Sequence, residues 1–324
     1  TIIVMTKESK PQRLLDDPSY HSLKEVPPEA DFIQQKRNRS EKTARAYQVD
    51  IDDFKNFIDI HKPEDYRLVT SKHVADWITK LKKQKLTNET ISRKVSAVSS
   101  LFKYYCGRSA LKNNPCNNIT RPKVESNIGK SDAISNTEAR KLLDAPPADT
   151  LKGLRDRAIL VVFLFHGLRR SEVKDLKINS IHDVQGVPHL RVKGKGSKTR
   201  DLPLHPVTLE RINAYLQNDG RTGFLESPLF CQLRKRKDTD GNLKAMSTNM
   251  IYIIVMNYAK IVGIKIENFH PHSLRATWAT NALSNHADLA KVQDYLGHAN
   301  IQTTKIYDKR TQILADSPTF KINY

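Results

Sequence analysis

The sequence predicts a mainly α-helical protein with two domains and one small β-hairpin or sheet. Its 324 residues exceed what a single compact core usually holds. Apolar residues recur at helical spacing through most of the chain, which indicates amphipathic helices. Between residues 187 and 204 the apolar spacing changes to two around a Gly-Lys-Gly turn, which is typical of a hairpin.

The chain is strongly basic, with 54 Lys and Arg residues against 35 Asp and Glu residues and a net charge of +19. Residues 1–30 carry a net charge of −1, whereas residues 31–130 and 131–324 carry +10 each. Both predicted domains are therefore basic, and this favours a polyanionic partner such as nucleic acid. The alternative, a surface that is basic only for solubility, usually carries a smaller charge.

The cysteine pattern and the hydropathy indicate in which cellular compartment the protein works. Cys106, Cys116 and Cys231 form no CxxC pair and are odd in number, which argues against a disulfide framework or a zinc site. The opening segment "TIIVMT" is too short for a signal peptide, and no run of about 18 apolar residues occurs. We expect a cytoplasmic, nucleoid-associated protein with no membrane partner.

The first predicted domain is helical and spans residues 35–121, after an irregular N-terminal extension over residues 1–34. Three segments carry apolar residues on one helical face. Their apolar positions are Tyr47, Ile51, Phe54 and Ile58; then Val74, Trp77, Ile78 and Leu81; then Ile91, Val95, Val98, Phe102 and Tyr105.

Polar faces of these helices collect basic residues that are candidates for DNA contacts, namely Lys83, Lys85, Arg93 and Lys94. For any single one of them, an ordinary solvated helix face explains the charge equally well. The acidic residues Asp50, Asp52 and Asp53 are interpreted as a solvated face of the first helix.

Residues 122–133 are polar, contain Pro122 and Gly129, and are predicted to be a linker. The second predicted domain, residues 134–310, begins with a helix whose capping box is Ser135 and Glu138. Residues 154–168 are apolar on nearly all sides and predict a buried central helix that ends at Gly167. The basic hairpin follows, then helices over 249–264, 274–285 and 288–298, and a tail over 311–324.

Arg, Lys, His and Tyr residues near these elements can together cut a phosphodiester without a metal ion. Arg binds the non-bridging oxygens bidentately, His transfers protons near neutral pH, Lys protonates a leaving oxygen, and Tyr can be a covalent nucleophile. Metal routes are poorly supported, because His270 and His272 lack further ligands at suitable spacing. No phosphate-binding GxxxxGK[ST] loop occurs. We expect neither a metal nor a cofactor.

Four segments match a known family in the correct order, and together they are specific. They are "HGLRRSEVKDL" (166–176), "LRVKGKGSKTRDLPL" (190–204), "HPHSLRATWAT" (270–280) and "LGHANIQTTKIY" (296–307). The second domain resembles the catalytic domain of the tyrosine recombinases, or phage integrase family. The helical first domain resembles the core-binding domain of that family less specifically. This resemblance implies a two-domain, C-shaped clamp on double-stranded DNA.

The resemblance implies six catalytic residues, with Tyr307 as nucleophile: Arg169, Lys195, His272, Arg275, His298 and Tyr307. Lys193 and Lys198 compete with Lys195 for the hairpin position, and with Arg200 they are candidate DNA contacts. Glu172 matches the acid of the motif and is interpreted as a partner that orients the arginine. Ala276 departs from the histidine often found there, at a position outside the catalytic set.

The implied reaction is site-specific recombination through a 3′-phosphotyrosine and a Holliday junction. Arg169 and Arg275 would hold the phosphate and favour the tyrosinate, His272 would handle the proton of Tyr307, and Lys195 that of the leaving oxygen. The family acts as a dimer on one DNA site and as a tetramer on two. An integrase of a mobile element and a resolution system share this chemistry, and so both remain open.

Two other readings remain. A type IB topoisomerase uses similar residues, and a non-catalytic DNA-binding protein would lack one or more of the six. Individually, four of the six have an ordinary structural explanation: helix-end side chains for Arg169, Arg275 and His298, and packing for Tyr307. The tail contains Ile313, Leu314, Phe320 and Ile322 and is predicted either to dock on a neighbouring subunit or to be a frayed terminus. The target DNA sequence cannot be read from side-chain patterns.

Overall fold

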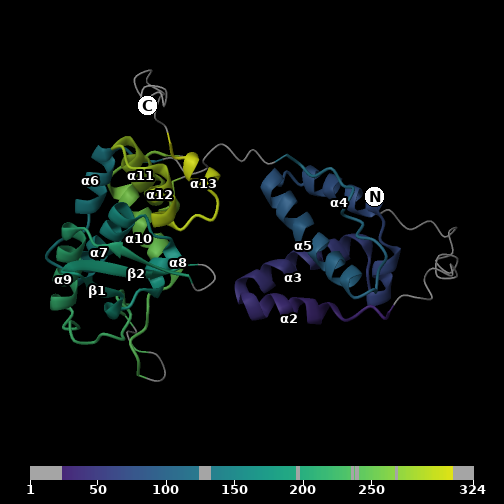
Figure 1. The fold of residues 1–324 in the computed structure, drawn as a ribbon, viewed down its shortest axis with the longest axis horizontal. Helices are drawn as coiled ribbons and strands as arrows, with labels where there is room; N and C mark the ends of the chain where they lie inside the picture. The colour runs from purple at the N-terminus through teal and green to yellow at the C-terminus, as the bar shows by residue number, and fades with distance from the viewer. Residues whose placement is uncertain are drawn as a thin grey trace, which may run out of the picture. The chain divides into compact units, whose positions relative to one another are not determined.

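The computed structural model describes residues 24–123, 133–194, 198–234, 237, 241–266 and 269–308. The chain divides into two compact units, Thr1–Glu125 and Ser126–Tyr324, here called the N-terminal and C-terminal units (Figure 1). The prediction of a mainly helical, two-domain protein with a small sheet is confirmed. The division falls within the predicted linker, most of which lies outside the described residues.

The N-terminal unit consists of helices around an aromatic core. They are α2 (Glu29–Arg39), α3 (Glu41–Ile58), the 3-10 helix η2 (Pro63–Leu68), α4 (Ser71–Lys83) and α5 (Asn88–Gly107). Trp77 is fully buried and meets the ring of Phe54 edge to face at 4.9 Å between centroids. Tyr66 and Phe102 pack in the same way at 5.7 Å. Such edge-to-face pairs add to the burial of apolar area and fix how the helices pack.

Helix α2 begins inside the segment that was predicted to be irregular, so that prediction is wrong from Glu29 onward. Phe32 and Ile33 are buried in the core of the unit, and Lys36 lies 4.7 Å from the centre of the Phe32 ring. The sequence signal is weak because the two core residues are adjacent and the helix has no side-chain cap at its start. Burial against α3 and α5 stabilises it instead.

The interpretation of Asp50 as part of a solvated face is also wrong, because Asp50 is 1% exposed. It pairs with Arg93 and Lys94, and Lys94 also donates to Asp53 at 2.8 Å. A carboxylate can be buried here because two cations of α5 compensate its charge. Of the four candidate DNA contacts in this unit, Arg93 and Lys94 therefore have carboxylate partners within it. Lys83 and Lys85 are exposed at the end of α4.

The C-terminal unit is built around helix α7 (Leu151–His166), which packs against α6 (Asn136–Asp144), α9 (Pro206–Asn218), α10 (Thr248–Ile261) and α11 (Pro271–Ser284). Its buried residues lie on all sides, as predicted. Figure 1 shows α7 within the unit, near the sheet and α9. The chain continues through α8 (Arg170–Asp175) and η3 (Ile178–Ser180) into the sheet, and ends with α12 (Leu289–Leu296) and α13 (Gln302–Lys305).

The sheet has three antiparallel strands in the order β1 (Ile181–Val184), β2 (Val187–Lys193) and β3 (Thr199–Pro203). The predicted hairpin is β2 and β3, whereas β1 was not predicted. Leu190 pairs with Leu202, and Val192 pairs with Arg200. Residues that are directly opposite lie on the same face, and alternate residues share that face. Arg200 therefore lies on the buried face, beside apolar side chains.

The part of the chain that the structure describes contains no helix long and apolar enough to cross a bilayer. Within the same residues, no group of three or more His, Cys, Asp or Glu side chains is arranged to hold a metal ion.

Candidate functional site

Two helix ends with left-handed glycines meet in the C-terminal unit. Gly167 ends α7 with φ of 57°, and Gly297 ends α12 with φ of 63°. A Cβ atom at Gly167 would lie 3.1 Å from Leu296 and from Trp278. Both the backbone conformation and the close packing therefore require glycine there. The carbonyl group of Gly167 accepts a hydrogen bond from Arg275, and that of Gly297 accepts one from Arg169.

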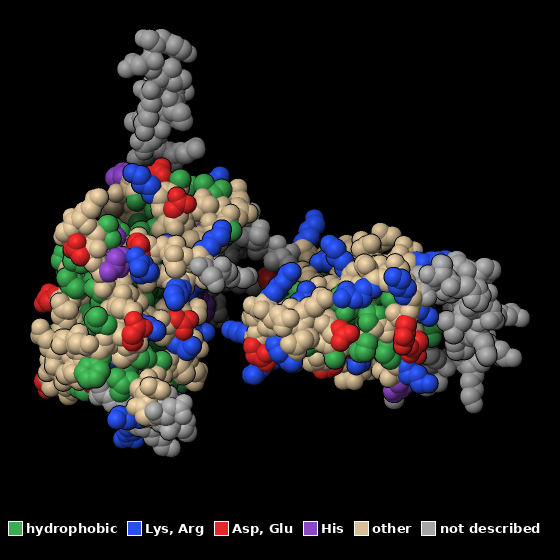
Figure 2. Space-filling model, turned by 60° about the horizontal axis from the view of Figure 1, so that its bottom comes forward, with side chains coloured by type: hydrophobic (Ala, Val, Ile, Leu, Met, Phe, Trp, Pro, Cys, Tyr) green, Lys and Arg blue, Asp and Glu red, His purple; other side chains and the backbone are tan. Residues whose placement is uncertain are grey.

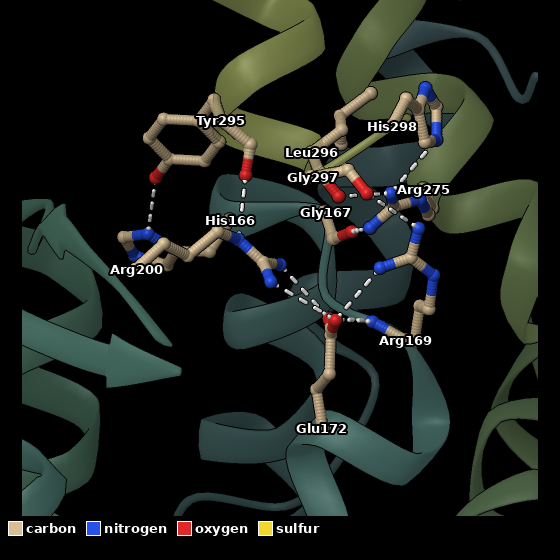
Figure 3. Close-up of polar contacts among 10 residues, drawn as sticks. All are labelled: His166, Gly167, Arg169, Glu172, Arg200, Arg275, Tyr295, Leu296, Gly297 and His298. Carbon is tan, nitrogen blue, oxygen red and sulfur yellow. Dashed lines mark hydrogen bonds and ion pairs between the residues drawn. The ribbon is translucent and has the colours of Figure 1, made fainter. Parts of the chain in front are cut away.

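Arg275 on α11 lies between the two helix ends and is fully buried. Its guanidinium donates to the carbonyl oxygens of Gly167 and Leu296, each at 2.6 Å, and to Nε2 of His298 at 2.9 Å (Figure 3). Among the described residues no carboxylate lies within ion-pair distance of Arg275, and its Nε has no hydrogen-bond partner. Burial and the nearby Arg169 lower the pKa of Arg275 to about 9, so it is still a cation at neutral pH.

Glu172 on α8 joins two further arginines and is itself 4% exposed. It accepts from the backbone N–H and Nη1 of Arg169 at 2.8 and 2.9 Å, and from Nη1 and Nη2 of Arg200 at 3.1 and 3.0 Å. Burial alone would raise the pKa of Glu172, but these hydrogen bonds, those of Arg200 foremost, hold it below its usual range. Arg169 and Arg200 thus share one carboxylate, and together with Arg275 they leave a net charge of about +2.

His298 follows Gly297 and accepts the hydrogen bond of Arg275 through Nε2. An imidazole nitrogen that accepts carries no proton, so the proton must be on Nδ1, which donates to the hydroxyl of Thr304 at 2.8 Å. Burial, followed by the charges of Arg275 and Arg169, lowers the pKa of His298 to about 3. It is therefore neutral at physiological pH. Thr304 is fully buried on α13, and its hydroxyl accepts the proton of Nδ1 in this tautomer.

Tyr307 comes just after α13 and is 8% exposed. Its ring packs in a cluster with Ala276, Leu283 and Leu296, and its hydroxyl lies 3.3 Å from Nε2 of His272. Burial raises the pKa of Tyr307, although Arg275 and Arg169 oppose this shift. The two arginines favour the tyrosinate, as expected, but burial outweighs them and the net shift of the pKa is upward. A phenol that stays protonated becomes a nucleophile only when a base takes its proton.

His272, near the start of α11, is placed to be that base. Desolvation by the surrounding protein, followed by the charge of Arg275, lowers its pKa to about 4, although part of the side chain is exposed. His272 is consequently neutral at physiological pH and can accept a proton through Nε2. Without this shift, a histidine would be partly protonated near pH 6.5.

The structure brings together five of the six residues predicted to be catalytic: Arg169, His272, Arg275, His298 and Tyr307. Lys195 lies outside the described residues. Lys193 and Lys198, its competitors and also candidate DNA contacts, flank the undescribed residues and are exposed.

Arg200 was predicted to contact DNA, but the structure places it in the Glu172 network with its side chain only 15% exposed. The alternation of the hairpin could have indicated this, because Arg200 shares the parity of Leu202. Thr304 was not predicted at all, and a single threonine in a short polar segment carries no signal in the sequence.

Comparisons with known proteins agree with this arrangement. The model of the phage integrase family matches residues 133–312, and that of the phage integrase N-terminal SAM-like domain matches residues 30–108. The chain belongs to the phage integrase family. Its family model spans all five assembled residues, and the predicted resemblance is confirmed.

Relatives in this family are tyrosine recombinases. The chain is 31% identical over 281 residues to tyrosine recombinase XerC of Thermodesulfovibrio yellowstonii, which covers 85% of this chain and 88% of that protein. It is 32% identical over 287 residues to tyrosine recombinase XerD of Lacticaseibacillus casei, covering 86% and 92%. The chain is thus a tyrosine recombinase, an enzyme of site-specific recombination.

Solved structures share the fold. XerH site-specific recombinase bound to palindromic difH substrate matches with a TM-score of 0.67 and 22% identity, over 86% of this chain and 80% of that one. A lambda integrase dimer bound to a COC′ core site matches with a TM-score of 0.65 and 16% identity, over 89% and 98%.

Proposed function

We propose that this tyrosine recombinase cuts and rejoins DNA strands through a 3′-phosphotyrosine on Tyr307, without a metal or nucleotide cofactor. The observation that carries the proposal is the buried cation Arg275, which has no carboxylate partner among the described residues and binds His298, whose ring lies beside that of Tyr307. A buried charge without a counter-ion is costly, and an entering anion removes that cost. A DNA phosphate beside the tyrosine is such an anion.

Each assembled residue has a part in this reaction. Arg169 and Arg275 bind the non-bridging oxygens of the scissile phosphate, and His298 orients Arg275 through its Nε2. The oxygen of Tyr307 bonds to phosphorus while its proton passes to His272, and the bond from phosphorus to the 5′ oxygen breaks. Lys195, in the hairpin loop, donates a proton to the leaving 5′ oxygen. One phosphoester replaces another, so the step requires no external energy source.

The partner in this proposal is double-stranded DNA that carries recombination sites. Repetition of the step with a 5′ hydroxyl of a second duplex exchanges strands and forms a Holliday junction. Structures of a lambda integrase dimer on a core site and of a lambda integrase tetramer on a Holliday junction support two subunits on one site and four on two. Lys and Arg side chains are spread over the visible face of both units (Figure 2), which suits a polyanion. The enzyme would work in the cytoplasm, at the nucleoid.

Trapping of covalent protein–DNA adducts tests the proposal. The intact protein is incubated with fragmented genomic DNA of its source organism, denatured and recovered, and the attached DNA ends are sequenced. Tyr307→Phe is the matched control, because it keeps the ring and its burial but removes the nucleophile. We expect 3′-linked adducts with the wild type and none with Tyr307→Phe, while both proteins bind DNA. DNA binding without any adduct from the wild type would favour the non-catalytic alternative and overturn the proposal.

The same data separate the remaining readings. Trapped ends that converge on one short sequence indicate a recombinase site, whereas scattered ends with relaxation of supercoils indicate topoisomerase activity. A site at the ends of an inserted element indicates an integrase. A site in the chromosome or a plasmid, away from any inserted element, indicates a resolution system.

A further inference from the structure

Arg200 is a largely buried cation of the C-terminal unit that the proposed chemistry does not use. It belongs to β3 and lies two residues after Lys198, where the hairpin loop with Lys195 rejoins the described chain. Its partner across the hairpin is Val192, which is fully buried. The guanidinium is therefore directed into the protein, where a long cation is not needed for packing alone.

Every nitrogen of the Arg200 guanidinium has an acceptor. Nη1 and Nη2 donate to the two carboxylate oxygens of Glu172, and Nε donates to the backbone oxygen of Tyr295 at 2.8 Å (Figure 3). Arg200 thus connects the hairpin to α8, which begins after Arg169, and to the end of α12, which presents His298. A planar fork with three used donors specifies one geometry, which a flexible ammonium cannot do.

The neighbours of Arg200 are close as well. A Cβ atom at Gly297 would lie 3.4 Å from Nη1 of Arg200, and one at Gly194, at the base of the hairpin loop, would lie 3.5 Å from it. The acceptor residue Tyr295 is itself held in place. Its hydroxyl lies 2.9 Å from Nδ1 of His166, and its ring stacks on Trp278 at 4.6 Å between centroids.

Arg200 also limits how Arg169 can pair. Glu172 accepts four hydrogen bonds, two from Arg200 and two from Arg169, and only one of the latter comes from the guanidinium of Arg169. The other terminal nitrogen of Arg169, Nη2, reaches the carbonyl of Gly297 at 3.3 Å. Removal of Arg200 would leave both oxygens of a buried carboxylate open to a bidentate pair with Arg169, the geometry that the two groups prefer.

We propose that Arg200 is a positioning residue of the recombinase: it occupies Glu172 so that Arg169 stays free for the scissile phosphate, and it fixes the base of the Lys195 hairpin against the turn that carries His298. The proposal rests on the proposed function, in which Arg169 binds phosphate. Arg200 itself touches neither the phosphate nor Tyr307 in this scheme.

The test measures single-turnover cleavage of a nicked duplex that carries the site recovered by adduct trapping. We expect Arg200→Met to cleave about 100-fold more slowly, since misplacement of a phosphate ligand by about 1 Å has that effect, with DNA affinity within about threefold. Arg200→Lys should not restore the rate, because one ammonium cannot serve Glu172 and Tyr295 together. Arg191→Met is the matched control, because Arg191 lies on the opposite, exposed face of the hairpin and pairs with Asp201. Its rate should match the wild type within about twofold.

A substrate with altered charge separates positioning from a general structural defect. In a methylphosphonate duplex, a neutral methyl group replaces one non-bridging oxygen at the scissile phosphorus. The cleavage rate then depends less on the charge of Arg169. We expect the defect of Arg200→Met to shrink at least tenfold on this substrate. An equal defect on both substrates, or wild-type cleavage by Arg200→Met, would overturn the proposal. The comparison is made within one protein preparation, so partial misfolding alters both rates alike.

A second variant covers the case in which Arg200→Met fails to fold. The double variant Arg200→Met with Glu172→Gln removes both charges, and so no buried carboxylate is left unpaired or free to capture Arg169. We expect the double variant to cleave faster than Arg200→Met. If Arg200→Met does not fold, the double variant is compared with Arg200→Ala at reduced temperature, and it should again cleave faster. A rate at or below those of the single variants would contradict the proposal. If the wild type itself forms no Tyr307 adduct, the proposed function fails instead, and the two failures are thus distinct.

Discussion

At the residue scale, the three arginines of the site have hydrogen-bond acceptors for nearly all of their nitrogens, but a carboxylate balances only part of their charge. Glu172 fills its acceptors with Arg169 and Arg200, whereas the partners of Arg275 within the described residues are neutral. The imidazoles of His272 and His298 stay neutral because burial and neighbouring arginines lower their pKa values to about 4 and about 3. The result is a cationic site that binds the phosphate in the proposed reaction, with a neutral imidazole beside a protonated tyrosine.

Thr304→Val tests the tautomer of His298. Valine keeps the shape of the side chain but cannot accept from Nδ1, so the proton is free to move to Nε2 and to disrupt the hydrogen bond from Arg275. We expect about a tenfold slower formation of the Tyr307 adduct, which corresponds to the roughly 1.4 kcal/mol of one such bond. Nitrogen NMR of the His298 ring checks the tautomer directly.

Thr303→Val is the control for this experiment, since Thr303 is an exposed neighbour on the same short helix. An unchanged ring spectrum and an unchanged rate in Thr304→Val would show that the hydroxyl does not hold His298.

The motifs in the sequence located all five residues that the structure brings together, through distinctive neighbours such as Gly167 and Gly297, whereas Lys195, the sixth, lies outside the described residues. They did not reveal Thr304, whose role depends on the three-dimensional distance to His298. Arg200 was misassigned because a basic residue on a hairpin was taken as exposed. Strand register, and not composition, decides which way its side chain points.

At the element scale, the site depends on how two helices end. Helix α7 and helix α12 both stop at left-handed glycines, and the carbonyls around those ends bind Arg275 and Arg169. The end of α7 was predictable, because a long apolar run stops at Gly167. The start of α2 was not, because its two core residues are adjacent and its helix has no capping side chain. Tertiary burial overrides such weak local signals.

Gly167→Ala should destabilise the C-terminal unit by about 2–3 kcal/mol, through a left-handed alanine and a Cβ atom placed 3.1 Å from Leu296 and Trp278. Urea unfolding at neutral pH measures the loss. Gly220→Ala is the matched control, because Gly220 is also left-handed, at φ of 65°, but has nothing within 4 Å of the added atom. It should lose only about 1 kcal/mol.

If Gly167→Ala and Gly220→Ala lose the same free energy of unfolding, then the close packing of Gly167 against α11 and α12 contributes nothing beyond the need for a left-handed backbone.

At the scale of the whole molecule, each of the two units has its own hydrophobic core, and each is basic, as the charge count of the two predicted domains indicated. The fold class and the division into two units followed from length and from periodicity. What the sequence could not supply was the set of buried charges, such as Asp50 with Arg93 and Lys94. Those depend on which helix faces meet, and a single sequence does not contain that information.

His166 should make the C-terminal unit sensitive to mild acid. Burial lowers its pKa to about 4, against about 6.5 in the unfolded chain, so the unfolded state binds the proton more readily. The contribution to stability is complete above pH 6.5 and is lost as the pH falls toward 4, by roughly 3 kcal/mol for this buried group. Urea unfolding at pH 7.5 and pH 5, followed by Trp278 fluorescence in a Trp77→Phe background, measures the part of the loss that falls above pH 5, about 2 kcal/mol.

His166→Gln is the variant for comparison, since glutamine retains donors and acceptors toward Tyr295 and Thr208 but does not titrate. It should be less stable at pH 7.5 and should lose less on acidification. The same dependence on pH in both proteins would assign the acid sensitivity to other groups.

The unmatched charge of Arg275 has a consequence for the lifetime of the protein in the cell. A chain that buries a cation with no carboxylate paired to it in the described parts is most stable when its substrate supplies the anion, since a ligand that binds only the folded state stabilises it. Copies that are not on DNA open more often and are exposed to proteases, whereas copies at a site are protected. Abundance would then follow the number of available sites, and limited proteolysis with and without site DNA measures that protection.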